Sequence, residues 1–562
     1  MNKNKKIVFD HIGEEIKDIV YNYIKAKSFT YSKGEKEAEN YFLNYFARIP
    51  YFQRNKEFYG AYPILGDTFH RSVCWAMRKG TLDDTIVMIH HYDVVTIEDF
   101  KLLKPLAFSP DELEKELFKI KDTLQPEVQE DLESKGYLFG RGVCDMKGGG
   151  AIQMALLSYY TQVENFKGNI IVLGVPDEEN LSAGMRSAVI LLSELQDKYG
   201  LQYKLMINSE PHQRKDLKKG VFSLGSVGKL MPFIYVRGSL AHAGKVFEGF
   251  NPLNLMSSIV RKTELNMELS DTVGQEASPP PTWLYLRDDK VNYDVSMPLS
   301  VSGCFSILTL NQTPSAILEK VKHICEEAFE EILKEMNDSY EAFLNATKQP
   351  LHKLPWESKV VDFSNLYKEA YETHGELFEQ EYKKEIKILY EKRKNNEMSL
   401  IACNFALVDF VYNFIDDLSP KVVYGLIPPY YPNVSNLFFD QLDDSIKMIA
   451  ENLNDFTWKE FNQEYTKEYF YTGISDLSYT SISNAKQVTK ALEDSMPFFG
   501  SLYDIPVTSI EKIAMPVINI GPWGKDFHKL TERVLKEDLY MRTPRIIKYA
   551  IDTILKEKYD NS

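Results

Sequence analysis

Short apolar runs alternate with helical segments through much of the chain. Four of the runs are rich in β-branched residues and follow the pattern of buried strands. They lie at residues 85–89, 169–175, 203–208 and 516–521. Helical segments occur between them, for example after Asp145 and from Ser187 onward. This alternation predicts an α/β fold with a largely parallel sheet and flanking helices.

A different pattern begins near Gly220. A strand-like segment at 229–238 precedes a helix that Asn251 can cap and Pro252 can open. An extended region follows, and then a second helix opened by Thr313. The resulting strand–helix–strand–strand–helix order predicts a small α+β domain with a ferredoxin-like arrangement.

The two patterns divide the chain into two domains, a division that its length of 562 residues also favours. The α+β domain would occupy 220–330, inserted into a larger domain formed by 1–219 and 331–562. The larger domain would carry a helical elaboration at about 331–410, where the sequence is strongly charged. A charge run of this kind is typical of a solvated helix face, and we favour that interpretation over a partner-binding surface.

Composition excludes several classes of partner. The formal net charge of −15 argues against nucleic acid, because phosphate binding requires clustered Lys and Arg. No run approaches the ~20 apolar residues of a membrane helix, and the basic N-terminus lacks the apolar region of a signal peptide. The five cysteines lie far apart, as is typical of reduced, buried thiols. We therefore expect a cytoplasmic protein with no membrane partner.

Candidate chemical groups follow the predicted strands. In open α/β sheets, ligands bind at the carboxyl ends of the strands. Each of the four strands is followed by histidine or acidic residues, and a glycine-rich segment at 137–150 adds another acid. These residues are His90, His91 and Asp93; Asp177, Glu178 and Glu179; Glu210; His528; and, in the glycine-rich segment, Asp145. Packing alone does not explain why four strands bring such side chains to one edge.

Each group also has an ordinary structural interpretation. Asp145 alone reads as a helix N-cap, and the acidic triplet at 177–179 alone reads as a solvated loop. Cys144 could be a metal thiolate, but we favour simple packing because zinc–thiolate sites usually contain paired cysteines. Taken together, five carboxylates in one crevice would repel one another strongly without cations. Two divalent ions would remove that repulsion and supply Lewis acidity.

The order of six motifs resembles a known family. The segments HYDVV, GRGVCDMKGG, DEE, SEP, AHAG and HKLTE resemble those of the M20 metallopeptidases and amidohydrolases. The resemblance covers about 35–325 and 470–550, and it is greatest to the RocB-type arginine-utilisation group. It implies that the larger domain is catalytic and that the inserted domain serves as a lid and a dimerisation surface. A homodimer is the assembly that this arrangement allows.

The resemblance also assigns metal ligands. It implies that His91 and Glu210 bind one divalent ion, and that Glu179 and His528 bind a second. Asp145 would bridge the two ions. Zn²⁺ is the metal we expect first, with Co²⁺ or Mn²⁺ as alternatives.

Three further residues receive roles from the same resemblance. Glu178 would be the general base toward the attacking water, and Asp93 would orient His91. His242, in the inserted domain, would donate a hydrogen bond to the oxyanion of the tetrahedral intermediate. We favour a structural or cavity-lining role for His90. The other histidines lack motif support and are expected to be surface or packing residues: 11, 70, 212, 323, 352 and 374.

These features favour a hydrolase that cleaves an amide or ureido C–N bond in a small, amino-acid-derived substrate. Analogy with the arginine-utilisation group points to derivatives of arginine, citrulline or ornithine. An exo- or dipeptidase that uses the same metals is the first alternative. A non-catalytic relative that binds an amino acid and regulates is the second, and the presence of every metal and base position argues against it.

Overall fold

The computed structural model describes residues 9–214 and 216–556, and the chain forms two compact units. The first unit contains the residues up to Ser226, Val434–Ile482 and the residues from Pro506 onward. The second contains Val227–Asn433 and Ser483–Ile505. The basic N-terminal residues 1–8 lie outside the described residues.

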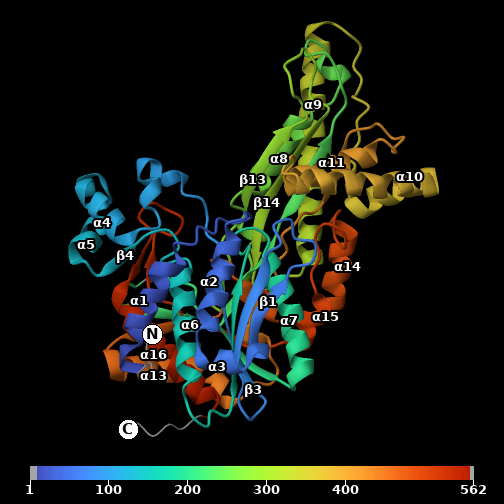
Figure 1. The fold of residues 1–562 in the computed structure, drawn as a ribbon. Helices are drawn as coiled ribbons and strands as arrows, with labels where there is room; N and C mark the ends of the chain where they lie inside the picture. Colours follow the sequence, from blue (N-terminus) through green and yellow to red (C-terminus); the bar gives the residue numbers. More distant parts are fainter. Residues whose placement is uncertain (1–8, 215, 557–562) are drawn as a thin grey trace. The chain divides into compact units, whose positions relative to one another are not determined.

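The first unit is built on an eight-stranded sheet (Figure 1). In sheet order the strands are β1 (Tyr59–Pro63), β2 (Ser72–Arg78), β5 (Asn169–Val175), β3 (Asp84–His91), β6 (Gln202–Asn208), β19 (Val517–Asn519), β7 (Lys219–Ser223) and β18 (Glu464–Glu468). The four central strands, from β5 to β19, run parallel to one another. They coincide with the four apolar runs of the sequence, so the predicted α/β architecture is confirmed.

Helices cover both faces of this sheet. One face packs against a large apolar core that includes residues of α1 (Ile12–Tyr23), α2 (Glu35–Ala47), α6 (Lys147–Tyr160), α13 (Ile449–Phe461) and α16 (Thr543–Ile554). The other face contacts α7 (Ala183–Tyr199), which in turn packs on α15 (Val507–Ile513). With both faces covered, β3 and β5 are buried along almost their whole length, which is why their sequences are continuous apolar runs.

A small antiparallel sheet completes the first unit. Its strands are β20 (Gly524–Lys525), β21 (Arg533–Leu535) and β4 (Tyr137–Phe139). The turn between β20 and β21 carries His528, and the glycine-rich segment with Asp145 follows β4. The small sheet therefore connects two of the candidate ligand segments.

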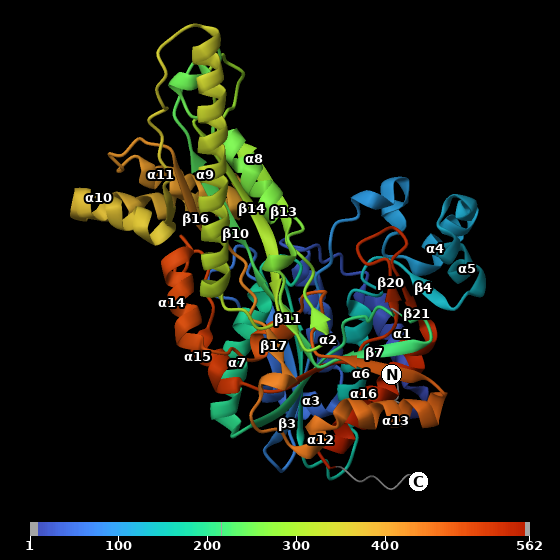
Figure 2. The same cartoon turned by 180° about the vertical axis from the view of Figure 1, so that it is seen from behind.

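The second unit contains an antiparallel sheet extended by one parallel strand (Figure 2). The order is β13 (Thr282–Asp288), β14 (Ser300–Thr309), β10 (Pro232–Arg237), β16 (Lys421–Leu426) and β15 (Val360–Asp362), with β9 (Gly228–Leu230) paired to β14. Helices α8 (Pro252–Thr263) and α9 (Pro314–Ala346) pack against it. The side chains of Asn251 and Thr313 cap these helices by accepting backbone N–H groups of Leu253 and Ala316. The predicted strand–helix–strand–strand–helix order is present.

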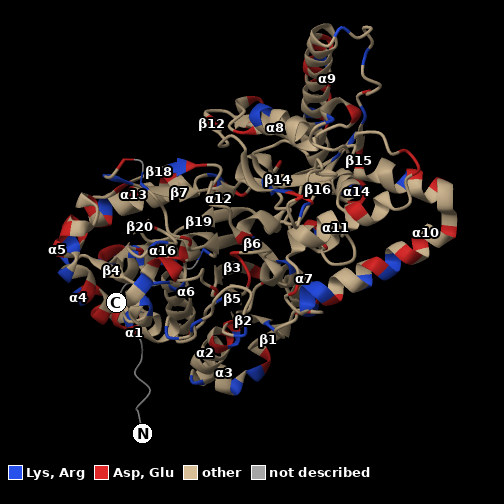
Figure 3. Ribbon diagram, turned by 90° about the horizontal axis from the view of Figure 1, so that it is seen from above, with Lys and Arg blue, Asp and Glu red and all other residues tan. Residues whose placement is uncertain are grey.

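The helical region after this domain lies in the second unit, whereas the sequence placed it in the larger domain. Helices α10 (Phe363–Lys394) and α11 (Leu400–Tyr412) share an apolar core with β10, β14 and β16. The second unit therefore comprises Val227–Asn433 and Ser483–Ile505, and not 220–330 alone. Acidic and basic residues are interspersed along α10, as expected for a solvated face (Figure 3). No described helix combines the length and the apolar character that a membrane crossing requires.

Candidate metal centre

Five candidate ligands converge at one edge of the main sheet. His91 is the last residue of β3, and Glu210 lies two residues beyond the end of β6. Glu179 lies in the turn that follows β5. Asp145 lies two residues before the start of α6, and His528 occupies the turn between β20 and β21. Because β5, β3 and β6 are parallel, their carboxyl ends meet at this edge.

Asp145 lies between the two histidines. Its Oδ1 atom is 3.0 Å from Nε2 of His91, and its Oδ2 atom is 3.1 Å from Nε2 of His528. Oε1 of Glu210 is 3.6 Å from Nε2 of His91, whereas Oε1 of Glu179 is 2.9 Å from Nε2 of His528. The five side chains thus form two groups that share one aspartate.

The electrostatics of this cluster are those of a cation site. Burial raises the pKa of Glu178 and of Glu210 well above the usual value, and neighbouring carboxylates raise both further. Hydrogen bonds with Asp145 and Glu179 raise the pKa of His528 to about 10. Without cations, protons on the imidazoles must offset the buried carboxylates.

The donor set fits divalent ions. Ligand atoms of His91, Asp145 and Glu179 all lie within 4.8 Å of one another. Imidazole nitrogen and carboxylate oxygen are the ligands that Zn²⁺ takes in catalytic sites. Two ions would carry four positive charges, which would offset the four carboxylates of Asp145, Glu178, Glu179 and Glu210.

Asp93 connects His91 to the acidic turn. Nδ1 of His91 is 3.1 Å from the main-chain oxygen of Asp93 and 3.5 Å from its Oδ1 atom. The same carboxylate accepts the backbone N–H groups of Glu178 and Glu179, at 3.1 Å and 3.3 Å. Thr30 Oγ1 donates to it at 2.9 Å. Asp93 is fully buried, so these contacts fix both the imidazole ring and the turn.

Glu532, which completes the last motif, holds the segment before Asp145. Its Oε1 atom accepts backbone N–H groups of Gly142, Cys144 and Asp145, at 2.8 Å, 3.3 Å and 3.3 Å. Its other oxygen pairs with the buried guanidinium of Arg141. The HKLTE motif contains Glu532, but the sequence does not indicate that this side chain binds the backbone before Asp145. The thiol of Cys144 is buried beneath the same loop, in agreement with the packing interpretation.

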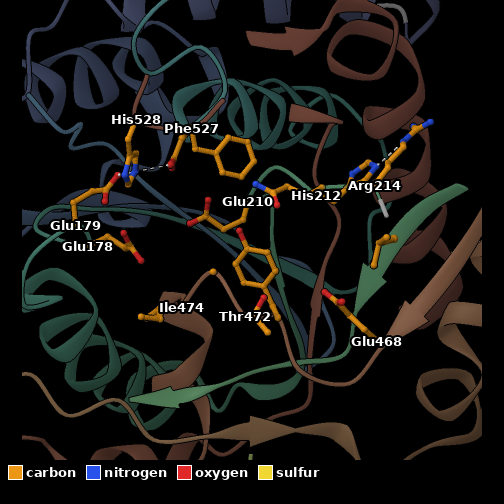
Figure 4. A pocket seen from close by; sticks show the side chains of 15 residues that line it. Glu178, Glu179, Glu210, His212, Arg214, Glu468, Thr472, Ile474, Phe527 and His528 are labelled. Carbon is orange, nitrogen blue, oxygen red and sulfur yellow. Dashed lines mark hydrogen bonds and ion pairs between the residues drawn. The ribbon is translucent and has the colours of Figure 1, made fainter. Parts of the chain in front are cut away.

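A cavity of about 420 Å³ opens beside the cluster, within the first unit (Figure 4). Asp145, Glu178, Glu179, Glu210 and His528 line it on one side. Its other lining residues include Val221, Phe527 and the segment Tyr471, Thr472, Gly473 and Ile474. Glu178 therefore reaches the same space as the candidate ligands.

Two further buried residues, His212 and Asp476, differ in their relation to the cavity. His212, assigned to the surface or to packing, is buried and lines the cavity, with Nδ1 2.9 Å from the Gly521 oxygen. The sequence could have indicated this position at the cavity, because His212 lies only two residues beyond the candidate ligand Glu210. Asp476 is buried and is not one of the residues that line the cavity.

The two remaining histidines of interest differ sharply. His90 is buried on the opposite side of β3 from His91, with Nδ1 3.0 Å from Gln153 Oε1 and Nε2 3.3 Å from the Tyr23 hydroxyl. Burial lowers its pKa to about 3, which agrees with a structural role. His242 lies in the second unit and is exposed, and its Nδ1 atom accepts the N–H group of Gly244 at 3.0 Å.

The comparisons with known proteins identify the family of the chain. Residues 121–549 match the model of peptidase family M20/M25/M40. The chain is 29% identical to the protein YqjN of Bacillus subtilis, over 97% of each sequence. It is 26% identical to the protein RocB of the same organism, over 98% of this chain and 97% of that one.

Solved structures of low sequence identity share the fold. A tripeptidase from Staphylococcus aureus superposes with a TM-score of 0.53 at 12% identity, and the match covers 97% of this chain and 99% of that one. The family match extends over more than half of the chain. The chain therefore belongs to peptidase family M20/M25/M40.

Proposed function

We propose that this metal-dependent hydrolase cleaves an amide or ureido C–N bond in a small, amino-acid-derived substrate. One observation carries the proposal: each carboxylate oxygen of Asp145 faces a different histidine, beside a cavity that also contains Glu178. His91 and Glu210 would hold one divalent ion, Glu179 and His528 the other, and Asp145 both. Zn²⁺ fits these ligands, and Co²⁺ or Mn²⁺ are alternatives.

The chain's own residues divide the chemical work. Divalent ions, when bound, supply Lewis acidity and make water more acidic. Glu178 takes a proton from the attacking water on its carboxylate and passes that proton to the leaving nitrogen. Burial strengthens this carboxylate as a base, because it raises the pKa of Glu178. Asp93 keeps the His91 ring oriented and holds the N–H group of Glu178, so the base and a ligand share one support.

His242 is suited to donate a hydrogen bond. Because its Nδ1 atom accepts the N–H group of Gly244, the neutral ring carries its proton on Nε2. An exposed Nε2–H group could stabilise the negative charge of the tetrahedral intermediate. We propose this role for His242, supplied by the same chain or by a second copy in a homodimer.

Substrates related to arginine, citrulline or ornithine come first in the proposal, by analogy with the arginine-utilisation group alone. The test is an activity screen of metal-loaded protein against N-acyl and N-carbamoyl amino acids, with dipeptides and tripeptides in parallel. Glu178→Gln serves as the inactive control. We expect turnover of an N-acyl or N-carbamoyl derivative. Turnover of peptides alone would favour the exo- or dipeptidase, and no turnover at all would favour a binding protein.

A further inference from the structure

The candidate ligands differ in how firmly the fold holds them. His91 ends β3, and Glu210 lies two residues past β6, so both stand close to the rigid sheet. Glu179 and His528 instead lie in turns, four residues past β5 and three residues past β20. A ligand on a turn needs support from neighbouring side chains to keep its geometry. The second ion site therefore depends on contacts outside the ligand set.

Each of these two turns contains an aspartate in the left-handed backbone region. Asp177 has φ +71° and precedes Glu179 by two residues, and Asp526 has φ +54° and precedes His528 by two residues. This conformation costs energy for a residue other than glycine, so surrounding contacts must maintain it. The two turns thus share the same feature at the same spacing from the ligand.

A buried arginine binds the first of these aspartates. Nη1 of Arg71 is 2.9 Å from Oδ1 of Asp177, and both side chains are at most 2% exposed. The same guanidinium pairs with Glu35 at 2.9 Å and with Asp67 at 2.6 Å. The second oxygen of Asp177 accepts the N–H group of Ala183 at 3.2 Å, at the start of α7. The turn is therefore attached to α2 and to α7.

A second buried arginine binds the other aspartate. Nη1 of Arg533 donates to Oδ2 of Asp526, and its Nε donates to Oδ2 of Asp131 at 2.7 Å. Thr531 Oγ1 donates to the same Asp526 oxygen at 2.8 Å. The Arg533 side chain is only 1% exposed. This pair closes the His528 turn across its base and ties it to α5 (Pro126–Ser134).

Burying a guanidinium is costly, and buried ion pairs are weak contributors to stability compared with apolar packing. Yet Arg71 and Arg533 are among the three largest fully buried side chains of the described residues. We propose that Arg71 and Arg533 are positioning residues, which hold Glu179 and His528 ready for the second metal ion. The proposal rests on the assignment of these two ligands under the proposed function.

Asparagine substitutions test the proposal without creating a cavity, because asparagine and aspartate have nearly the same shape. Asp177→Asn and Asp526→Asn keep the shape and tolerate the left-handed region, but they remove the charge that each arginine binds. Stepwise titration with Co²⁺, followed by calorimetry and by visible absorption, separates the two ions. We expect each variant to bind the second ion about 10–100-fold more weakly and to alter the visible absorption of the Co²⁺ bound there. The affinity for the first ion should not change.

Arg71→Lys and Arg533→Lys should lower the affinity for the second ion less than the asparagine variants do, because lysine retains the positive charge but loses the planar, bidentate geometry of the guanidinium. Arg78→Lys is the matched control. It changes a part-buried arginine at the far end of β2, which donates to the Tyr160 and Val163 carbonyls, and it should leave both ions unaffected.

Each outcome has one meaning. Fewer than two ions in the unchanged protein would overturn the proposed function itself. Two ions there, with unchanged second-ion affinity in both asparagine variants, would overturn only the positioning role. An equal loss of affinity for both ions would also overturn the positioning role, because that pattern indicates a general loss of structure.

Discussion

Asp145 Oδ2 lies 3.1 Å from His528 Nε2, although 383 positions separate the two residues in the sequence. The other oxygen of Asp145 faces His91 at 3.0 Å. No other candidate ligand contacts both histidines through separate oxygens among the described contacts. A carboxylate in this position is the one ligand whose loss should affect both halves of the site.

Asp145→Asn is therefore expected to abolish binding of both divalent ions. The amide keeps the shape of the side chain but loses the charge that two cations require. Elemental analysis of reconstituted protein should fall from near two equivalents to near zero. His528→Gln is the comparison, since it should remove only the second ion. Retention of one tightly bound ion by Asp145→Asn would contradict the bridging role.

Glu178→Gln should retain the fold and both ions but lose most turnover. The amide cannot accept a proton from water, and loss of a general base typically costs about 10²–10⁴ in rate. Steady-state kinetics together with metal analysis provide the check. Near-normal turnover would mean that another carboxylate is the base, and Glu179 would then be examined first.

His242→Ala should lower kcat by about 10²–10³ and leave the metal content unchanged, as expected for the loss of an oxyanion donor. His323→Ala is a suitable control, because His323 is another exposed histidine of the second unit. Unchanged kcat would leave His242 with only its structural contact to Gly244.

Mixing His242→Ala with Asp145→Asn protein tests whether a second copy supplies the donor. Recovered activity in the mixture would show that the histidine and the metals come from different chains. No recovery from a mixture of stable mixed dimers would place both in one chain.

Removal of the metals should lower the melting temperature. An ion that binds only the folded state stabilises it by about 2.7 kcal/mol when its free concentration is 100 times its Kd. A chelator should therefore shift the unfolding transition of the unchanged protein but not that of Asp145→Asn. Equal shifts in both proteins would indicate that the stabilising ion binds elsewhere.

Glu532→Gln should lower the affinity for both ions by about 10–100-fold. Glutamine can still accept one backbone N–H group, but it cannot pair with Arg141 and hold the whole segment before Asp145. Titration of each ion checks this result. A loss of affinity for the second ion alone would mean that Glu532 supports His528 and not Asp145.

Much of this fold could be predicted because local patterns match the final burial. The apolar run at 169–175 is β5, and the caps Asn251 and Thr313 stand where the sequence placed them. The different roles of His90 and His91 follow from strand geometry, because neighbouring residues of a strand point to opposite faces. The assignment of α10 and α11 to the second unit required tertiary packing on β10 and β16, which no local signal reveals.

The convergence of the candidate ligands at one edge of the sheet could also be predicted, because strand ends and short motifs locate these side chains. Their supports could not be. Arg71 binds Asp177 across 106 positions, and Glu532 reaches the N–H group of Asp145 across 387. A lone arginine in a sequence has no periodicity or motif that indicates a buried ion pair. Only the folded chain shows which carboxylate it binds.

Anomalous diffraction from crystals of Zn²⁺-reconstituted protein tests the central claim most directly. The account predicts two anomalous peaks roughly 3.5–4 Å apart, one on each side of Asp145. His91 and Glu210 should contact the first, and Glu179 and His528 the second. A single peak, or two peaks that do not share Asp145, would contradict the account.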